Sequence, residues 1–261
     1  MDSVNKTLYI PLYGKALVSK KGIILKDNKA EEIWQSQSFK LKGKSKSKWL
    51  AYFMSMRAKI FDDWLKNAIK QTQNAIVLHL GCGLDSRVLR VNAENQLWYD
   101  VDFESVIEKR KKYFTESKNY RMICADISNA NFIEQLPKNL NAIVLMEGVS
   151  MYLQTEQLKN IFCALKKHFN SVFVLVDCYS EFGAKMSKIK NPIKEVGVNM
   201  VYGVKNANQL IDGTGLVFSE ELSLTPDYLI NELKGFEKFI FKNLYAGKIS
   251  KKIYKLYEYK A

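Results

Sequence analysis

Five short apolar runs in the middle of the chain predict the strands of a sheet. They span residues 75–81, 96–102, 120–127, 141–148 and 171–180. Apolar residues at helical spacing lie between several of these runs, at 86–91, 103–114, 131–136 and 155–169. Strands that alternate with helices, and that are apolar along most of their length, are typical of a parallel sheet covered on both faces. The pattern therefore predicts an α/β fold with a doubly wound, mostly parallel sheet of seven strands, the last two within residues 199–224.

The two ends of the chain have other patterns. Residues 1–74 are expected to form a helical N-terminal cap, because apolar positions from Phe53 to Leu65 recur on one helical face. Residues 75–227 are expected to form the main domain, and residues 228–261 a basic, tyrosine-rich helical tail. No internal repeat or low-complexity linker separates these parts.

The end of the first predicted strand is the first candidate site. The strand runs directly into Gly81, Cys82 and Gly83. Glycine lets a backbone turn sharply and approach a ligand closely, and in a doubly wound sheet ligands bind at the carboxyl ends of the strands. A purely structural turn would give the same three residues, so this motif alone is weak.

Acidic residues end three more of the predicted strands. Asp102, followed by Phe103, lies 21 positions after Gly81, which is the spacing expected for a carboxylate that binds ribose hydroxyls. Asp126 and Glu147 end the next two strands. Because the carboxyl ends of parallel strands meet at one edge, these acids are expected to converge on a single crevice.

The glycine spacing narrows the ligand. Dinucleotide-binding turns have a third glycine, whereas this chain has Ser86 near that place, and it has no phosphate-binding loop of the G-x-x-x-x-G-K-[ST] type. A nucleoside without phosphates is therefore favoured over a pyrophosphate. S-adenosylmethionine is such a nucleoside, and a nicotinamide-dependent oxidoreductase is the least favoured alternative.

Composition and charge bound the remaining possibilities. The 261 residues are 47% hydrophobic, but no apolar run approaches the roughly 18 residues that a membrane span needs. Residues 1–75 have 15 Lys and Arg against 6 Asp and Glu, residues 76–231 have 17 against 18, and residues 232–261 have 8 against 3. Basic flanks attract anionic partners such as RNA, lipid headgroups or acidic metabolites. A lysine-rich solvated surface is the plainer explanation, since nucleic-acid recognition usually uses more Arg.

Cysteine and histidine usage indicates a reducing compartment and no metal site. The four cysteines lie far apart and are interpreted as buried free thiols, and the N-terminus has no secretory signal pattern. A cytoplasmic location is therefore expected. The two histidines are too few for a His-rich metal site, and His79, inside the first strand, is expected to be a hydrogen-bonded core residue.

Four segments, taken in order and spacing, resemble a known family. They are VLHLGCGLDSRVLR, WYDVDFESVIEKRKKYF, ICADI and LMEGVSMYLQTEQLKNIF. Together they are similar to the leucine carboxyl methyltransferase and polyketide O-methyltransferase family, which consists of class I S-adenosylmethionine-dependent enzymes with a Rossmann-like fold. The resemblance covers residues 7–180 well and the rest loosely.

The resemblance implies a role for each matching position around S-adenosylmethionine. The backbone of Gly81, Cys82 and Gly83 would run alongside the methionine portion. Asp102, followed by Phe103, would bind the ribose hydroxyls. Asp126 and Ile127 would contact the adenine, and Glu147 would contact the methionine ammonium.

Other residues are candidates with alternatives. Arg57 is our candidate for the methionine carboxylate, because a guanidinium group matches a carboxylate in geometry; the alternative is a surface ion pair with Asp62 or Asp63. Lys20 and Lys21 are weaker candidates. Tyr152 is expected to line the acceptor side near the sulfonium as the catalytic-site residue, although a core tyrosine is equally compatible. Asp85 and Arg87 are interpreted as a buried pair that shapes the turn.

The predicted function is transfer of a methyl group to a carboxylate or hydroxyl of a small molecule. Residues 180–205 are expected to form a lid over the acceptor. Its apolar side chains Phe182, Met186, Pro192 and Tyr202 lie among lysines, including Lys188 and Lys190, which would suit an anionic acceptor. The alternatives are methylation of RNA or a modified tRNA base, and a non-catalytic S-adenosylmethionine-binding module.

Overall fold

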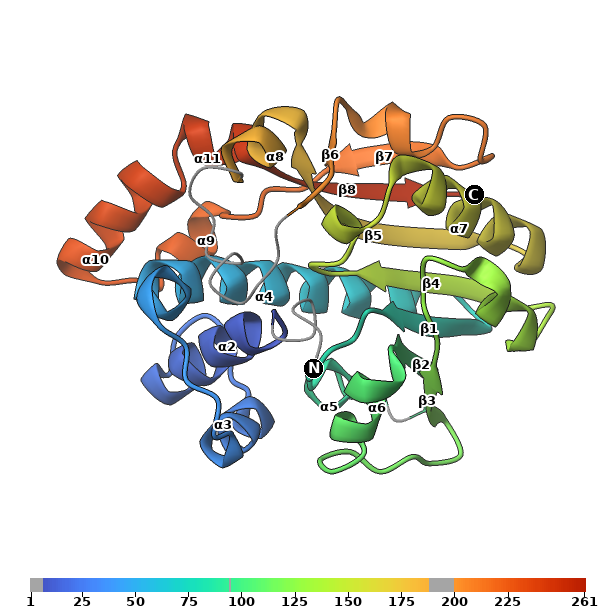
Figure 1. Ribbon diagram of the computed structural model, residues 1–261, viewed down its shortest axis with the longest axis horizontal. Coiled ribbons are helices and arrows are strands. Elements are labelled where there is room, and N and C mark those ends of the chain that lie inside the picture. Colours follow the sequence, from blue (N-terminus) through green and yellow to red (C-terminus); the bar gives the residue numbers. More distant parts are fainter. Residues whose placement is uncertain (1–6, 94, 188–199) are drawn as a thin grey trace.

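The computed structural model describes residues 7–93, 95–187 and 200–261, and a mixed sheet lies at its centre (Figure 1). Among these residues the sheet has eight strands, in the order β3-β2-β1-β4-β5-β8-β7, with β6 paired to β5 outside this path. The strands are β1 Ala75–Leu80, β2 Leu97–Asp102, β3 Tyr120–Cys124, β4 Asn141–Met146, β5 Val172–Ser180, β6 Gly203–Val204, β7 Val217–Glu221 and β8 Tyr254–Lys260.

The first five strands and β6 pair in parallel, and β8 is antiparallel to both β5 and β7. The predicted doubly wound, mostly parallel sheet is confirmed, with the short β6 in addition to the seven strands of the main path. From β1 the chain continues to β2 and β3 on one side of the sheet, whereas β4 and β5 lie on the other side, so the strand order reverses between β1 and β4. A ligand site is expected where the strand order reverses in this way.

The C-terminal segment corrects one expectation. The sequence predicts a helical tail over residues 228–261, but residues 254–260 form strand β8 between β5 and β7. Tyr254, Leu256 and Tyr259 are buried, whereas Lys255 and Glu258 between them are only partly covered. Aromatic residues that alternate with polar ones favour a strand, and the open edge of β5 provides the hydrogen-bonding partner that the local sequence does not reveal.

Helices cover the sheet and extend beyond it. Before β1 come α2 Tyr9–Lys21, α3 Asn28–Ser36, the 3-10 turn η1 Gly43–Lys46 and α4 Lys48–Gln71. Within the sheet region are α5 Arg87–Arg90, α6 Glu104–Arg110, η2 Ala130–Gln135, η3 Ser150–Tyr152, α7 Thr155–His168, α8 Glu181–Ser187 and η5 Ala207–Leu210. Before β8 come α9 Asp227–Ile230, α10 Gly235–Ile240, the π-helical η6 Phe241–Tyr245 and α11 Lys248–Ile253.

Strand β1 shows how both faces of the sheet are filled. All six of its residues are buried. Ile76, Leu78 and Leu80 point into a cluster that contains the buried side of α7, and Val77 points into a second cluster that contains the buried side of α4. Side chains of a strand alternate between faces, so the continuous apolar run is explained by helices on both sides.

The buried-thiol expectation holds for only two cysteines. Cys82 and Cys178 are buried, whereas Cys124 and Cys163 are exposed. Cys124 ends the edge strand β3, and Cys163 lies on the outer side of α7, so neither has a second layer above it. No helix in the described part of the chain has the length and apolar character needed to cross a membrane.

Candidate active site

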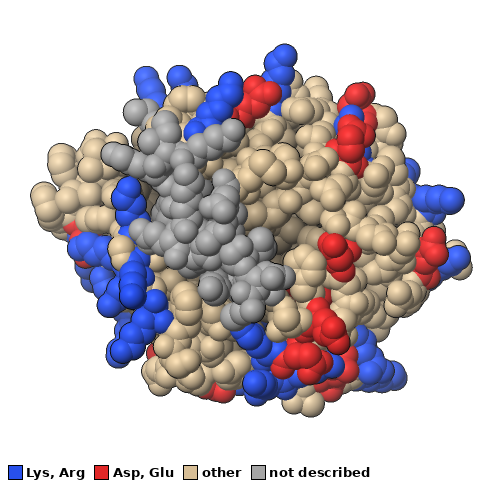
Figure 2. Space-filling model, viewed as in Figure 1, with Lys and Arg blue, Asp and Glu red and all other residues tan. Residues whose placement is uncertain are grey.

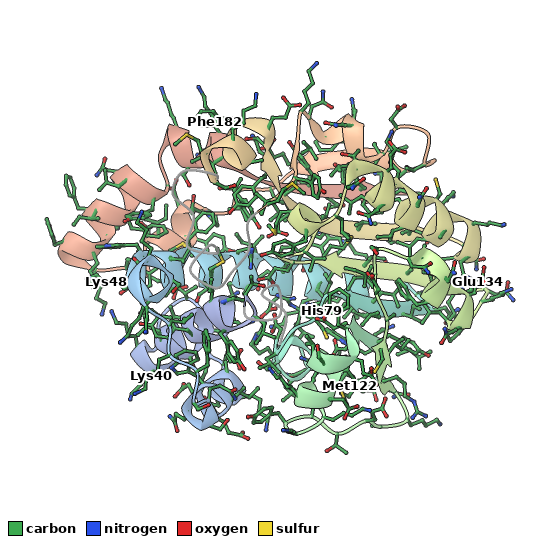
Figure 3. The ribbon with its side chains drawn as sticks, in the orientation of Figure 1. Lys40, Lys48, His79, Met122, Glu134 and Phe182 are labelled. Atoms are coloured by element: carbon green, nitrogen blue, oxygen red, sulfur yellow. The ribbon has the colours of Figure 1, made fainter. Side chains whose placement is uncertain are left out.

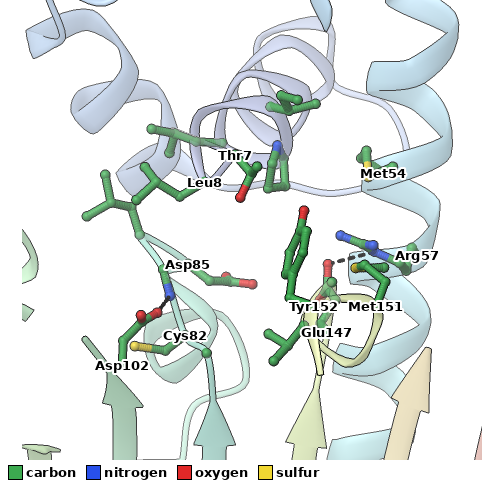
Figure 4. A pocket seen from close by; sticks show the side chains of 18 of the residues that line it. Thr7, Leu8, Met54, Arg57, Cys82, Asp85, Asp102, Glu147, Met151 and Tyr152 are labelled. Atoms are coloured by element: carbon green, nitrogen blue, oxygen red, sulfur yellow. Dashed lines mark hydrogen bonds and ion pairs between the residues drawn. The ribbon is translucent and has the colours of Figure 1, made fainter. Parts of the chain in front are cut away.

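A cavity of about 1330 Å³ lies at the carboxyl ends of β1, β2 and β4 and beneath the N-terminal helices (Figure 4). All ten residues expected at the site line it, although they come from separate parts of the chain. They are Arg57, Gly81, Cys82, Gly83, Asp102, Phe103, Asp126, Ile127, Glu147 and Tyr152. The chain therefore brings the predicted set together around one space.

The turn after β1 requires glycine for two physical reasons. Gly81 has a φ of +67° and Gly83 a φ of +54°, a region that residues with a side chain rarely adopt. A Cβ atom on Gly81 would also lie 2.2 Å from Cγ2 of Val149. Buried Arg110 on α6 donates to the Gly83 carbonyl at 3.1 Å, so the turn is held from outside as well. Arg110 was not singled out from the sequence, because only the fold brings α6 to the turn.

Asp102 closes the other side of this turn. Its carboxylate accepts hydrogen bonds from the backbone N–H groups of Gly83 and Phe103, each at 2.8 Å. Burial raises the pKa of Asp102 to about 6, although the two backbone N–H groups oppose this shift. Farther along the cavity, Ile127 is buried and Asp126 is exposed, with the Asp126 carboxylate accepting from the Ser128 N–H at 2.9 Å.

Glu147 occupies the opposite wall and is ionised. Its carboxylate accepts from Nε of Arg57 at 3.1 Å and from a guanidinium nitrogen of Arg87. Burial opposes ionisation of Glu147, but Arg87 and Arg57 outweigh it and lower the pKa of Glu147 to about 2. A fixed negative charge therefore faces the cavity at physiological pH.

Arg57 is buried and held by residues that the sequence reasoning missed. Its Nη1 donates to Asp177 at 2.7 Å and to the Tyr254 hydroxyl at 3.0 Å. Asp177, in β5, also accepts from the Tyr254 hydroxyl at 2.5 Å and from the Gly148 N–H at 2.7 Å. The alternative of an ion pair between Arg57 and Asp62 or Asp63 is wrong, because Asp62 pairs with Arg87 and Arg90 and Asp63 with Lys59.

A charged network continues from Glu147 behind the glycine turn. Asp85 and Arg87 are both buried and lie 3.4 Å apart, as the expected buried pair. Asp85 also pairs with Arg90 at 2.7 Å and with Lys15 of α2 at 3.0 Å. Lys15 is 97% covered, so the N-terminal helices are tied to the turn by a desolvated ion pair.

His79 lies in the interior near the end of β1 (Figure 3). Its Nε2 is 3.2 Å from Nη1 of Arg87, and its Nδ1 is 3.2 Å from Oδ1 of Asp100. Burial lowers the pKa of His79, and the Asp100 carboxylate opposes this shift. The expectation of a hydrogen-bonded core histidine is confirmed.

Tyr152 stands between the acidic part of the cavity and an apolar part. Figure 4 shows its ring pointing upward between Asp85 and Arg57, toward the level of Thr7. Burial raises the pKa of Tyr152, and a hydrogen bond with Thr7 opposes this shift, so the phenol is neutral. Apolar and aromatic residues from α4, from the ends of β4 and β5 and from the C-terminal segment make up much of the remaining lining: Leu50, Phe53, Met54, Met151, Tyr179, Leu244, Tyr245, Ile253 and Tyr254.

Several other candidates lie elsewhere. Lys20 is exposed on α2, and Lys21 pairs with Glu237 at 3.6 Å; neither lines the cavity. Phe182, Met186 and Tyr202 of the expected lid do not line it either. Lys188, Lys190 and Pro192 fall outside the described residues.

The chain is similar to several known methyltransferases. The chain is 26% identical to the tetracenomycin polyketide synthesis O-methyltransferase TcmP of Streptomyces glaucescens over 243 residues, which are 92% of this chain and 90% of that protein. It is 23% identical to the S-adenosyl-L-methionine-dependent methyltransferase dpfgK of Gibberella zeae, over 71% of this chain and 67% of that protein. The structure is similar to that of magnesium protoporphyrin IX methyltransferase from Synechocystis PCC 6803 with bound SAH, with a TM-score of 0.51, 12% identity and coverage of 89% and 92%.

The fold is that of the Rossmann-like class I methyltransferases. The sequence matches the family described as leucine carboxyl methyltransferase over residues 3–166, and the chain belongs to that family. It is an S-adenosylmethionine-dependent methyltransferase.

Proposed function

We propose that this enzyme transfers the methyl group of S-adenosylmethionine to a carboxylate or hydroxyl oxygen of a small, largely apolar molecule. One observation supports this most: a single cavity joins the acidic strand ends to a wall of apolar and aromatic side chains. The first part suits a polar nucleoside, and the second suits an acceptor whose remaining surface is apolar.

The residues of the first part match the groups of S-adenosylmethionine. Asp102 would accept hydrogen bonds from the ribose hydroxyls, and Asp126 with Ile127 would bind the adenine. Glu147 would face the ammonium. Arg57 would meet the carboxylate, with Asp177 as the positioning residue that holds the guanidinium. The methionine portion would pass along the Gly81–Gly83 turn, where Gly81 leaves room for the side chain of Val149.

The chemistry then needs positioning more than proton transfer. When bound, S-adenosylmethionine supplies an electrophilic methyl group on sulfur, which an acceptor oxygen takes by in-line displacement. The protein's task is to hold that oxygen about 3 Å from the methyl carbon and to exclude water. An acceptor carboxylate is already ionised and needs no base, whereas a hydroxyl acceptor would need one. Tyr152 would shape the acceptor side as a neutral phenol.

The apolar part of the cavity indicates the polarity of the acceptor. Phe53 and Met54 of α4 and Leu244 of η6 provide apolar contact surface. The relative TcmP is named as an O-methyltransferase of polyketide synthesis, which supports oxygen as the acceptor atom. A negative charge on the acceptor stays a prediction from Lys188 and Lys190, to be tested by replacing both with Glu.

The apolar acceptor side favours a small molecule over RNA. Sequence-tolerant RNA contacts need a basic groove along the phosphates, whereas the acceptor side of the cavity is lined mainly by apolar and aromatic side chains. A non-catalytic binding module would bind S-adenosylmethionine and transfer nothing.

The proposed activity can be tested with a donor that has an isotopically labelled methyl group and a fractionated cell extract. We expect label in a small, organic-extractable product as a methyl ester or ether, identified by mass spectrometry. Label only in RNA would contradict the proposal, and so would tight donor binding without label in any fraction.

The pH dependence of cofactor binding tests the role of Asp102. Ribose hydroxyls donate to the ionised carboxylate, and the pKa of Asp102 in the free protein is about 6. A proton on Asp102 therefore competes with the ligand. The affinity for S-adenosylhomocysteine should fall by about tenfold per pH unit below pH 6. Titration calorimetry from about pH 5 to about pH 8, which spans the pKa of Asp102, measures this change in affinity.

Asp102→Ala is the matched control for this profile. We expect it to weaken binding at neutral pH by about 1–3 kcal/mol, because buried hydrogen-bonding groups lose their partner. The fall in affinity below pH 6 should also disappear. A variant with unchanged affinity, or with the same pH dependence as the wild type, would show that Asp102 does not bind the ribose.

A further inference from the structure

Helix α10 and the turn η6 that continues it expose an unusual row of apolar side chains. Phe236 is 75% exposed, Phe239 66% and Leu244 72%, and Ile240 is half-buried beside them. Residues three or four positions apart are neighbours on a helix, so these four side chains form one continuous ridge, here called the α10 ridge. Folded monomers rarely leave a contiguous apolar surface uncovered without a binding role.

Basic side chains flank the α10 ridge. Lys234, Lys242 and Lys248 are exposed in the same segment. Its acidic residue, Glu237, is paired with Lys48 at 2.8 Å and with Lys21 at 3.6 Å. In Figure 2 the projection at the left, where Figure 1 shows α10, is mostly tan, and Lys and Arg side chains gather directly below it. Figure 3 places Lys48 on this same side.

The ridge is continuous with the acceptor side of the cavity. Leu244 belongs to the ridge and also lines the cavity, and the next residue, Tyr245, lines it too. Tyr245 stacks on Trp49 of α4 with ring centroids 5.5 Å apart, and buried Phe241 anchors η6 to the body of the protein. The ridge is therefore a fixed surface next to the cavity.

We propose that the α10 ridge docks on an anionic lipid surface and thereby opens the acceptor side of the cavity toward the apolar phase. Exposed Phe and Leu side chains with lysines beside them are the features by which helices lie in a membrane interface, the rings entering the acyl boundary and the ammonium groups meeting lipid phosphates. An apolar acceptor dissolved in the lipid would then reach the cavity without crossing water.

Charge disfavours a second copy of this chain as the occupant. In a twofold contact the same patch meets itself, so Lys234, Lys242 and Lys248 would approach their own counterparts. The whole chain has a net charge of +13, which adds to the repulsion. An anionic surface instead attracts each of these lysines.

Delivery of the acceptor rests on the proposed function, but the docking does not, and it is tested by sedimentation of the full chain with vesicles, which needs no methyl transfer. Vesicles of phosphatidylcholine with phosphatidylserine are compared with vesicles of phosphatidylcholine alone. We expect binding to the first, much weaker binding to the second, and a loss of binding as salt is raised. The double variant Phe236→Ser with Phe239→Ser should bind the anionic vesicles at least roughly tenfold more weakly.

Val217→Ser is the matched control, since Val217 is 60% exposed but lies on the edge strand β7. It should bind vesicles like the wild type, and all three proteins should melt at similar temperatures because the altered side chains are exposed. Three outcomes would overturn the proposal: no binding to anionic vesicles, equal binding by the double variant, or a dimer in analytical ultracentrifugation that the double variant abolishes. The last would identify the ridge as an interface between copies.

Discussion

Arg57→Met is expected to lower both the free energy of unfolding and the affinity for the cofactor. The substitution leaves the buried carboxylate of Asp177 without the cation that faces it at 2.7 Å. Removing one partner of a buried ion pair typically costs about 3–5 kcal/mol. Glu147 is less affected, because Arg87 still donates to it. Urea denaturation followed by circular dichroism measures the loss of stability.

The effect on the cofactor must be separated from this loss of stability. Asp177→Asn removes the negative charge, while the amide oxygen can still accept from the Gly148 N–H and the amide NH2 group can donate to the Tyr254 hydroxyl oxygen, since these two partners contact different carboxylate oxygens of Asp177. The double variant Arg57→Met with Asp177→Asn should therefore recover part of the stability.

Comparing Asp177→Asn with the double variant isolates the guanidinium of Arg57. We expect S-adenosylhomocysteine to bind about tenfold to a hundredfold more weakly to the double variant, the range for a lost charge-assisted hydrogen bond. Equal affinities in calorimetry would show that Arg57 stabilises the fold and does not bind the methionine carboxylate.

Gly81→Ala is expected to weaken cofactor binding strongly, because two separate penalties act at that position. A residue with a side chain at a φ of +67° is strained by about 1–2 kcal/mol. The added methyl group would also lie 2.2 Å from Cγ2 of Val149, so the Val149 side chain must move. We expect at least a tenfold loss of S-adenosylhomocysteine affinity, together with a lower melting temperature.

Gly22 provides a matched control for this substitution. It also has a φ of +67°, at the C-terminal end of α2, but a Cβ atom there would have nothing within 4 Å. Gly22→Ala should therefore show the backbone strain alone and leave cofactor binding unchanged. Adding Val149→Ala to Gly81→Ala should restore part of the affinity by removing the crowding. If Gly81→Ala binds the cofactor as well as Gly22→Ala does, the close approach of Val149 does not affect cofactor binding.

The acidic half of the candidate site could be predicted from the sequence because each of its residues ends a strand. Asp102 and Glu147 follow apolar runs directly, and parallel strands bring their carboxyl ends to one edge whatever the loops between them do. The φ values of Gly81 and Gly83 likewise depend on a local turn, which the glycine pattern indicates. Short-range order along the chain is enough to specify such features.

The acceptor half and the ion pairs depend on contacts between distant parts of the chain. Asp177 lies in an apolar run that predicted only a strand, and its partner Arg57 is 120 positions away. Tyr254 reaches the same carboxylate because β8 inserts beside β5, and the local pattern of residues 228–261 suggested helix.

The sequence by itself determined the order of strands and helices as far as β7, the glycine turn and the acids at the strand ends, since these depend on residues adjacent in the chain. Only the tertiary structure decided that α4, β5 and β8 meet around Arg57 and that η6 joins the cavity wall. The physical reason is that a buried charge must find its partners wherever the packed chain supplies them, and that choice leaves no periodic signal in the sequence.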